Sequence, residues 1–280
     1  MSLEHASRTA LSAAAHRAAH QLLEQGSIFS DPLALRILGD ESEGLVREAV
    51  EWPHSRRMRL LIAARTRFAE DALGTAVERG LRQLVVLGAG LDTYGYRGSH
   101  RDQLQIFEVD HPATQTWKRE RLTAAGIPIP AGLSFVAVDF ERDEVLERLV
   151  AAGFDPRQPA FFTWLGVVPY LAGEDIWRTL AFIAALPGGA SVVFDYGEPT
   201  QMLAPEARSV RDEFARRVAE LGEPWVSFFD PAELHGRLGA MGFGEIEDHA
   251  GTEIVAHYLS LASTAAAGGA HVVRATSFLA

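Results

Sequence analysis

Residues that could bind a ligand follow three successive predicted strands. The segment Gly88-Ala89-Gly90 follows an apolar run at 84–87, Asp110 ends a second apolar run, and Asp139 follows a third. Because the carboxyl ends of parallel strands meet at one edge of an open α/β sheet, we expect these residues to surround one crevice. Carboxylates accept hydrogen bonds from hydroxyl and amino groups. The set therefore predicts a site for a nucleoside-like ligand.

The glycine pair narrows the choice of ligand. Gly88 can adopt φ values closed to other residues, and Gly90 carries no Cβ that would keep a ligand from the backbone. A dinucleotide fingerprint would place a third glycine at position 93, where Thr93 stands, and no Gly-Lys-Ser/Thr sequence of a P-loop follows. A glycine pair alone occurs in many turns. With the acids that follow, it favours an adenosine ligand without phosphates, such as S-adenosylmethionine.

Each acid has a structural alternative. Asp110 lies about twenty positions beyond Gly88, where nucleotide-binding α/β folds place an acid for the ribose hydroxyls. Glu108 shares its side of the strand, but Asp110 is nearer the carboxyl end and is preferred. Either acid could instead cap a helix that opens at His111-Pro112. Asp139 with Phe140 suits an adenine, although a turn acid beside a core phenylalanine would give the same pattern.

Alternating hydrophobic patterns predict the elements that position these residues. The strand candidates are 84–87, 105–109, 134–138, 160–164, 190–195, 243–247 and 270–278. The helix candidates are 5–25, a short helix after Asp31-Pro32, and 56–73, 112–125, 142–152, 174–186, 201–221 and 231–241. Such alternation is typical of a doubly wound, mostly parallel α/β sheet of Rossmann-like type, here with seven strands. We predict one domain over 1–280, made of a helical preface or lid (1–80), a cofactor-binding core (81–196), a helical lid insert (197–230) and a C-terminal part of the sheet (231–280).

Two histidines in the first predicted helix raise the question of a metal. His16 and His20 lie four residues apart and could share a helix face. No third ligand and no zinc-protease glutamate accompanies them, so we expect a solvated pair and no metal site.

Composition excludes several classes of partner. The net charge of -11 argues against nucleic acid, and no run of Lys and Arg suggests a membrane surface. Without cysteine, neither disulfides nor thiolate metal sites can form. No leader sequence or apolar run of transmembrane length is present. We therefore expect a soluble, cytoplasmic protein that acts on a small molecule, and the sequence leaves the oligomeric state open.

Several spaced segments resemble the leucine carboxyl methyltransferase family, which includes protein phosphatase carboxyl methyltransferases and bacterial O-methyltransferases of small molecules and polyketides. The resemblance runs from about position 28 to the end. The matching segments are Ser30-Asp31-Pro32-Leu33-Ala34, Ala64-Arg65-Thr66-Arg67, Val85-Val86-Leu87-Gly88-Ala89-Gly90-Leu91-Asp92-Thr93 with Tyr96-Arg97, Glu108-Val109-Asp110-His111-Pro112 with Lys118, Val138-Asp139-Phe140, and Trp164-Leu165-Gly166-Val167-Val168-Pro169-Tyr170-Leu171.

The resemblance implies S-adenosylmethionine as the cofactor and assigns roles to single residues. By this analogy Arg65 reaches the carboxylate of the methionine moiety, and Gly88 and Gly90 let the backbone approach that moiety. Asp110 holds the ribose. Adenine lies against two residues, Asp139 and Phe140. Many relatives have a glutamate after the tryptophan of the fourth motif, where this chain has Leu165, so any contact made by that glutamate is lost or moved.

The predicted function is an S-adenosylmethionine-dependent O-methyltransferase that acts on a carboxylate or hydroxyl of a small metabolite, in secondary metabolism among other settings. A carboxylate acceptor needs no general base, whereas a hydroxyl would benefit from one. Candidates for catalysis are Tyr170, Tyr196 and His111, for which packing or helix capping is the alternative. Other classes remain open: an NAD(P)-dependent oxidoreductase, although no Tyr-x-x-x-Lys pair supports it, or a non-catalytic nucleoside-binding protein.

Overall fold

The computed structural model describes residues 8–140, 142–262 and 269–278, and its centre is a seven-stranded sheet of order β3-β2-β1-β4-β5-β7-β6. All neighbouring strands run parallel except β7, which is antiparallel to both β5 and β6. The strands are β1 (Gln83–Leu87), β2 (Gln105–Asp110), β3 (Leu133–Ala137), β4 (Ala160–Trp164), β5 (Ala190–Gly197), β6 (Phe243–Ala250) and β7 (Ala270–Ser277).

The strand β1 lies at the point where the order of the sheet reverses. It pairs with β2 on one side, with Val85 opposite Phe107, and with β4 on the other, with Val86 opposite Thr163. All five residues of β1 are buried, because helices cover both faces of the sheet here. In open α/β sheets a ligand crevice forms outside the carboxyl ends of the strands at such a reversal.

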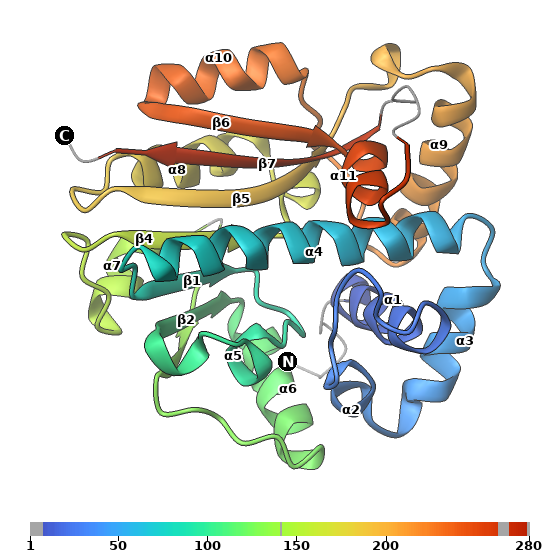
Figure 1. Cartoon of the computed structure of the whole chain (residues 1–280), viewed down its shortest axis with the longest axis horizontal. Helices are drawn as coiled ribbons and strands as arrows, with labels where there is room; N and C mark the ends of the chain where they lie inside the picture. The colour runs from blue at the N-terminus through green and yellow to red at the C-terminus, as the bar shows by residue number, and fades with distance from the viewer. Residues whose placement is uncertain (1–7, 141, 263–268, 279–280) are drawn as a thin grey trace.

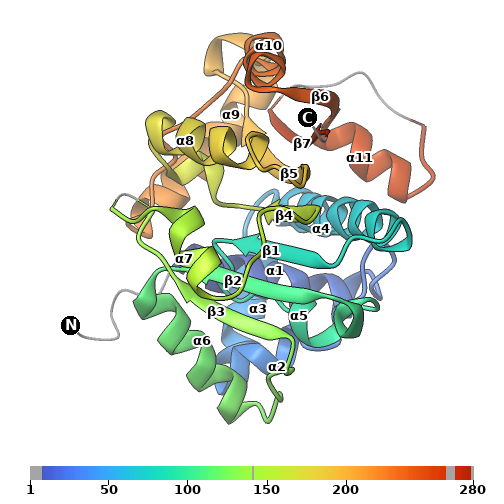
Figure 2. The ribbon, with the colours of Figure 1, turned by 90° about the vertical axis from the view of Figure 1, so that its left-hand side faces the viewer.

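Helices cover both faces of the sheet. Figure 1 shows α4 lying along the strands in front of the sheet, and Figure 2 shows α4 and α11 on one side of the sheet with α7 and α8 on the other. The helices of four or more residues are α1 (Arg8–Leu23), α2 (Ala34–Leu38), α3 (Ser42–Glu51), α4 (Ser55–Glu78), α5 (Tyr94–Arg97), α6 (Pro112–Ala124), α7 (Val145–Ala151), α8 (Gly173–Ala184), α9 (Pro205–Glu220), α10 (Pro231–Met241) and α11 (Gly251–Tyr258). None of these described helices is both long and apolar enough to cross a bilayer.

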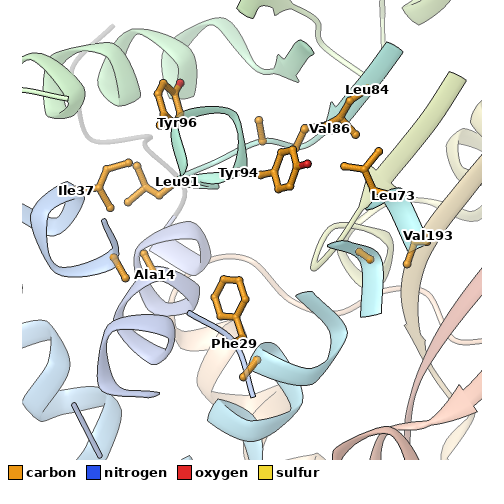
Figure 3. Close-up of a cluster of buried hydrophobic side chains, with 14 of the residues drawn as sticks. Ala14, Phe29, Ile37, Leu73, Leu84, Val86, Leu91, Tyr94, Tyr96 and Val193 are labelled. Atoms are coloured by element: carbon orange, nitrogen blue, oxygen red, sulfur yellow. The ribbon is translucent and has the colours of Figure 1, made fainter. Parts of the chain in front are cut away.

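The helices that precede the sheet share its hydrophobic core. Figure 3 shows side chains of α1 and α2, such as Ala14 and Ile37, beside Leu91 of the loop that follows β1. Phe29 is also buried in this cluster, at 2% exposure. The N-terminal helices therefore pack as part of the same core as the sheet.

A buried polar network also ties these helices to the loop after β1. The fully buried carboxylate of Asp31 accepts hydrogen bonds from Arg17 Nε at 3.1 Å and from Thr93 Oγ1 at 2.8 Å. Arg97 Nε lies 3.4 Å from the second carboxylate oxygen, and Arg17 Nη2 donates to the Leu91 carbonyl at 2.6 Å. Buried charges need such partners, so this network fixes α1 over the loop.

The predicted elements can now be compared with the observed ones. All seven predicted strands occur, with β5 and β6 longer than expected because they extend to Gly197 and Ala250. Three helices were not predicted: α3, the four-residue α5 and α11. The expectation of a solvated histidine pair was wrong: His16 and His20 are 5% and 0% exposed because the face of α1 that carries them packs inward. The first three residues of the predicted helix 5–25 lie outside the described residues, and the division of the chain into preface, core and insert stays a prediction.

Candidate functional site

A cavity of about 380 Å³ lies at the carboxyl edge of the parallel strands. The loops that follow β1, β2, β3 and β4 each contribute to its wall, and α1 and α4 close it from the side of the N-terminal helices. Every residue predicted to bind a cofactor lines it, namely Arg65, Gly88, Gly90, Asp110, Asp139 and Phe140. The fold thus brings residues that lie up to 75 positions apart in the sequence, from Arg65 to Phe140, around one space.

Asp110 is held in place by two backbone groups. Its Oδ2 accepts a hydrogen bond from Gly90 N at 2.6 Å, and its Oδ1 accepts one from His111 N at 2.7 Å. Burial raises the pKa of Asp110 although these two hydrogen bonds oppose the shift. Each carboxylate oxygen has a second lone pair, so the side chain can still accept hydrogen bonds from hydroxyl groups in the cavity.

Glu108 lies on the same side of β2 but beneath the cavity. It is 1% exposed, and its Oε2 lies 2.7 Å from Lys118 Nζ and accepts a hydrogen bond from the Tyr96 hydroxyl at 3.1 Å. Burial raises the pKa of Glu108 to about 7, and the Lys118 ammonium opposes the shift. Lys118 also contacts the Ala89 carbonyl at 3.5 Å. The structure thus places Asp110 in the wall of the cavity. Glu108 is buried outside the cavity and binds Lys118, which in turn contacts the glycine loop at Ala89.

Two glycines allow close approaches that a side chain would block. Gly88 has a φ of +63°, and a Cβ at this position would lie 2.3 Å from Val167 Cγ2. A Cβ at Gly166 would lie 2.6 Å from Arg65 Nη2. The loops after β1 and β4 therefore pack against each other and against α4 only because both positions lack side chains.

Arg65 reaches into the cavity from α4 with one donor unused. Its Nη1 donates to Asp195 Oδ2 at 2.7 Å, and the other oxygen of Asp195 accepts a hydrogen bond from Gly166 N at 2.6 Å. Within the described part of the chain the buried Nε of Arg65 has no hydrogen-bond partner. An unsatisfied buried donor is costly, and a ligand carboxylate at this point would satisfy it. The residues present therefore fit a cofactor that carries a carboxylate.

The wall after β3 is apolar on one side and acidic on the other. Phe140 stacks beside Trp164, with ring centroids 6.5 Å apart and planes inclined by 25°. Asp139 is partly buried, and its Oδ2 lies 3.7 Å from the exposed Arg142 Nε. A flat heteroaromatic ring with an exocyclic amine could contact both groups.

The three catalytic candidates lie in different surroundings. Tyr170 lines the cavity, and burial raises the pKa of its hydroxyl, so it is neutral at pH 7 and a poor base. His111 also lines the cavity, but its Nδ1 accepts a hydrogen bond from Ala113 N at 3.3 Å, which makes it the N-cap of α6. Tyr196 lines a different cavity, and its hydroxyl donates to Asp248 at 2.5 Å. The structure therefore brings two of the three candidates to the first cavity.

The sequence did not indicate three polar residues that line this cavity or, in the case of Asp195, pair with Arg65 in its wall. Asp195 lies within β5, and Arg17 projects from α1 into the first cavity. Glu223 follows α9, and its Oε1 accepts a hydrogen bond from Arg8 N at 2.9 Å. The rule that pointed to Asp110, an acid near the carboxyl end of a strand, applies equally to Asp195. Glu223 has no such signal, because it meets α1 through contacts with Arg8 and Thr9, which lie 215 and 214 positions away in the sequence.

Comparisons with known proteins point to one family. A sequence model of the leucine carboxyl methyltransferase family matches residues 10–184. YktD of Bacillus subtilis (strain 168), provisionally named an S-adenosyl-L-methionine-dependent methyltransferase, is 32% identical over 223 residues, which cover 79% of this chain and 71% of that protein. MT0153 of Mycobacterium tuberculosis (strain CDC 1551 / Oshkosh), with a similar provisional name, is 37% identical over 131 residues, which are 47% of this chain and only 42% of that protein.

The fold has solved counterparts as well. A crystal structure described as a provisional methyltransferase from Thermobifida fusca YX aligns with a TM-score of 0.59 at 18% identity, covering 94% of each chain. At that identity the likeness concerns the fold, and it agrees with the seven-stranded α/β sheet described above.

Proposed function

The chain belongs to the leucine carboxyl methyltransferase family, and on that premise we propose that it transfers a methyl group from S-adenosylmethionine to a carboxylate or hydroxyl oxygen of a small metabolite. The observation that carries the proposal is the 380 Å³ cavity, whose wall combines the ends of four parallel strands with Arg65 of α4. Its volume lies within the roughly 300–1,000 Å³ typical of small-molecule sites.

Each cofactor-binding residue has a proposed task that its position supports. Asp110 accepts hydrogen bonds from the ribose hydroxyls, and Asp139 and Phe140 contact the adenine. Arg65 pairs with the carboxylate of the methionine moiety, for which its unpartnered Nε is available. Gly88 and Gly90 let the chain approach the same moiety, and the Gly90 amide stays engaged with Asp110.

The chemistry requires alignment more than acid–base assistance. When bound, the sulfonium group of S-adenosylmethionine supplies a methyl carbon that is already activated toward nucleophiles. The protein holds the donor, excludes water and positions the acceptor oxygen in line. Leu165 and Tyr170 supply apolar and neutral polar surface to the cavity at the end of β4. The neutral hydroxyl of Tyr170 can orient an acceptor, and its raised pKa makes it unsuited to remove a proton.

The composition of the chain supports a proposal for its binding partners and its cellular location. We propose a small-molecule acceptor, and the net charge of -11 supports a partner other than nucleic acid. The absence of cysteine is compatible with a cytoplasmic protein.

Binding and transfer can be tested separately. We expect micromolar binding of S-adenosylmethionine or its demethylated product by calorimetry, and transfer of label from methyl-labelled cofactor to a small molecule in a metabolite extract. Fluorescence titration with a reduced nicotinamide cofactor separates this function from an oxidoreductase. Binding of the demethylated product without any label transfer would indicate a nucleoside-binding protein, and failure of both would refute the proposed function.

A further inference from the structure

A second cavity, of about 110 Å³, has both residues of the Arg65–Asp195 ion pair in its wall. Arg65 borders both cavities, and Pro169 of the second is the chain neighbour of Tyr170 of the first. The second cavity is formed by α4, the end of β5, α9 and the segment that follows α9. A molecule in this space would therefore lie beside the methionine end of a cofactor held by Arg65.

The walls of this cavity suit a single aromatic ring. Four aromatic side chains line it, from β5, from α9 and from the segment after α9: Tyr196, Phe214, Trp225 and Phe228. Aromatic rings pair favourably edge to face, and an apolar cavity of roughly 150 Å³ can hold a benzene molecule. A cavity of about 110 Å³ that is partly open to solvent is close to the size of one aromatic ring.

The charges around the ring site are mostly positive. The charged residues of the lining are three arginines, Arg57, Arg65 and Arg211, and one acid, Asp195, in a chain whose net charge is -11. Arg211 Nε is buried without a hydrogen-bond partner in the described part of the chain. The exposed Arg57 makes no ion pair with any residue of the described ranges. Two cationic side chains with unused donors at one cavity favour an anionic ligand.

We propose that this second cavity is the acceptor pocket, and that it takes a hydroxylated aromatic acid whose carboxylate faces Arg57 and Arg211 and whose hydroxyl faces Asp195. The inference rests on the proposed function and adds the class of acceptor to it. The hydroxyl oxygen forms the new bond to the methyl carbon while the bond from sulfur to that carbon breaks, and sulfur keeps the electron pair as a neutral thioether. The hydroxyl proton becomes strongly acidic as the new bond forms and passes to Asp195 and then to water.

The decisive comparison uses a charged probe and its neutral isostere. The full chain, loaded with the demethylated cofactor, is titrated with 4-hydroxybenzoate and with 4-hydroxybenzamide by calorimetry. We expect the acid to bind at least about tenfold more tightly than the amide, as a charge-assisted contact implies. Arg57→Met should remove most of this preference, and Arg56→Met should retain it, because Arg56 is exposed on the same helix and faces Glu24. Equal binding of acid and amide by the unmodified chain, or an unchanged preference in Arg57→Met, overturns the inference.

A cavity-filling variant provides an independent readout. Ala207 of α9 is buried in the wall, and Ala207→Phe should fill the ring site. We expect this variant to lose binding and methylation of 4-hydroxybenzoate while keeping its affinity for the demethylated cofactor, which also reports that the protein is folded. If the filled variant still methylates the acid at the unmodified rate, the second cavity is not the acceptor pocket although the chain is a methyltransferase. If the unmodified chain binds no demethylated cofactor, the proposed function fails, and the inference fails with it.

Discussion

Gly90 donates its backbone N–H to Asp110 Oδ2 at 2.6 Å, so the acid that ends β2 also fixes the glycine loop after β1. The two residues are 20 positions apart and meet because β1 and β2 are parallel neighbours in register. Asp110 therefore shapes the cavity in addition to facing it.

Replacing Asp110 should weaken cofactor binding. We expect Asp110→Ala to reduce the affinity for the demethylated cofactor by roughly 1.5–3 kcal/mol, the scale of a charge-assisted hydrogen bond together with the loss of support for the loop. Calorimetry measures this, with Asp102→Ala as the control because Asp102 is 81% exposed and makes only a surface pair with Arg101. Equal affinities of the two variants would remove Asp110 from the site.

Two arginines on α4 allow a matched test of the cofactor carboxylate contact. Arg65 lines the cavity, whereas Arg67 is half exposed and pairs with Asp71. Arg65→Ala should weaken binding of the demethylated cofactor by roughly 1.5–3 kcal/mol, and Arg67→Ala should leave it unchanged. Arg65→Lys should recover little, because an ammonium group cannot form a bidentate pair with a carboxylate. Full recovery by lysine would argue for a simple point charge.

A comparison of alanine variants at Gly88 and Gly126 distinguishes the cost of backbone strain from the cost of a steric clash. The φ values of these glycines are +63° and +62°, but of the two only Gly88 has a neighbour, Val167, within 4 Å of the position that a Cβ would take. Gly126→Ala should cost about 1–2 kcal/mol of unfolding free energy from the left-handed backbone alone. Gly88→Ala should cost more and should abolish cofactor binding, because the loop must move. Urea unfolding and calorimetry measure the two effects, and similar losses in both variants would show that the contact with Val167 is unimportant.

The buried carboxylate of Asp31 should contribute strongly to stability. Asp31→Asn leaves Arg17 and Arg97 without their shared counter-charge, and removal of one partner of a buried ion pair costs about 3–5 kcal/mol. The half-exposed pair of Asp71 with Arg67 provides the control, for which the loss should be small. Chemical unfolding of the two variants gives the comparison. A small loss for Asp31→Asn would mean that water reaches the network.

His16 should make stability depend on pH. Burial, with smaller contributions from Arg59, Arg217 and Arg65, lowers the pKa of His16 from its ordinary 6.5 to about 4. The unfolded chain therefore binds a proton between these values while the folded chain does not. Stability from this residue is fully present above pH 6.5 and falls, by on the order of 3 kcal/mol, as the pH drops to 4.

The comparison of His16→Gln with the unmodified chain isolates this effect. We expect the difference in unfolding free energy between the two proteins to change between pH 6.5 and 4 and to stay constant above pH 7. His257→Gln, in the C-terminal part of α11 and exposed, should follow the unmodified chain at every pH. Parallel stability curves for His16→Gln and the unmodified chain would show that His16 takes up a proton in the folded state.

The sequence alone determined the strands of the sheet and the residues at the edge of the sheet where the ligand is expected to bind. Runs of apolar residues that end in glycine or acid are local features, and the alternation of strand and helix allows few arrangements. For that reason the seven strands were predicted correctly, and the residues expected at the cavity, from Gly88 to Phe140, line it in the structure. Membership of the leucine carboxyl methyltransferase family followed from the same segments.

Only the tertiary structure decided which side chains meet across the chain. The pairing of Arg65 with Asp195, the contact of Glu223 with α1 and the burial of His16 join segments whose separation leaves no periodic signal in the sequence. The second cavity depends on the same kind of contact, because α9 must fold back over the end of β5 before its aromatic residues can enclose a ring. Local sequence patterns indicate which face of a helix or strand is apolar, whereas tertiary packing determines which other segment that face contacts.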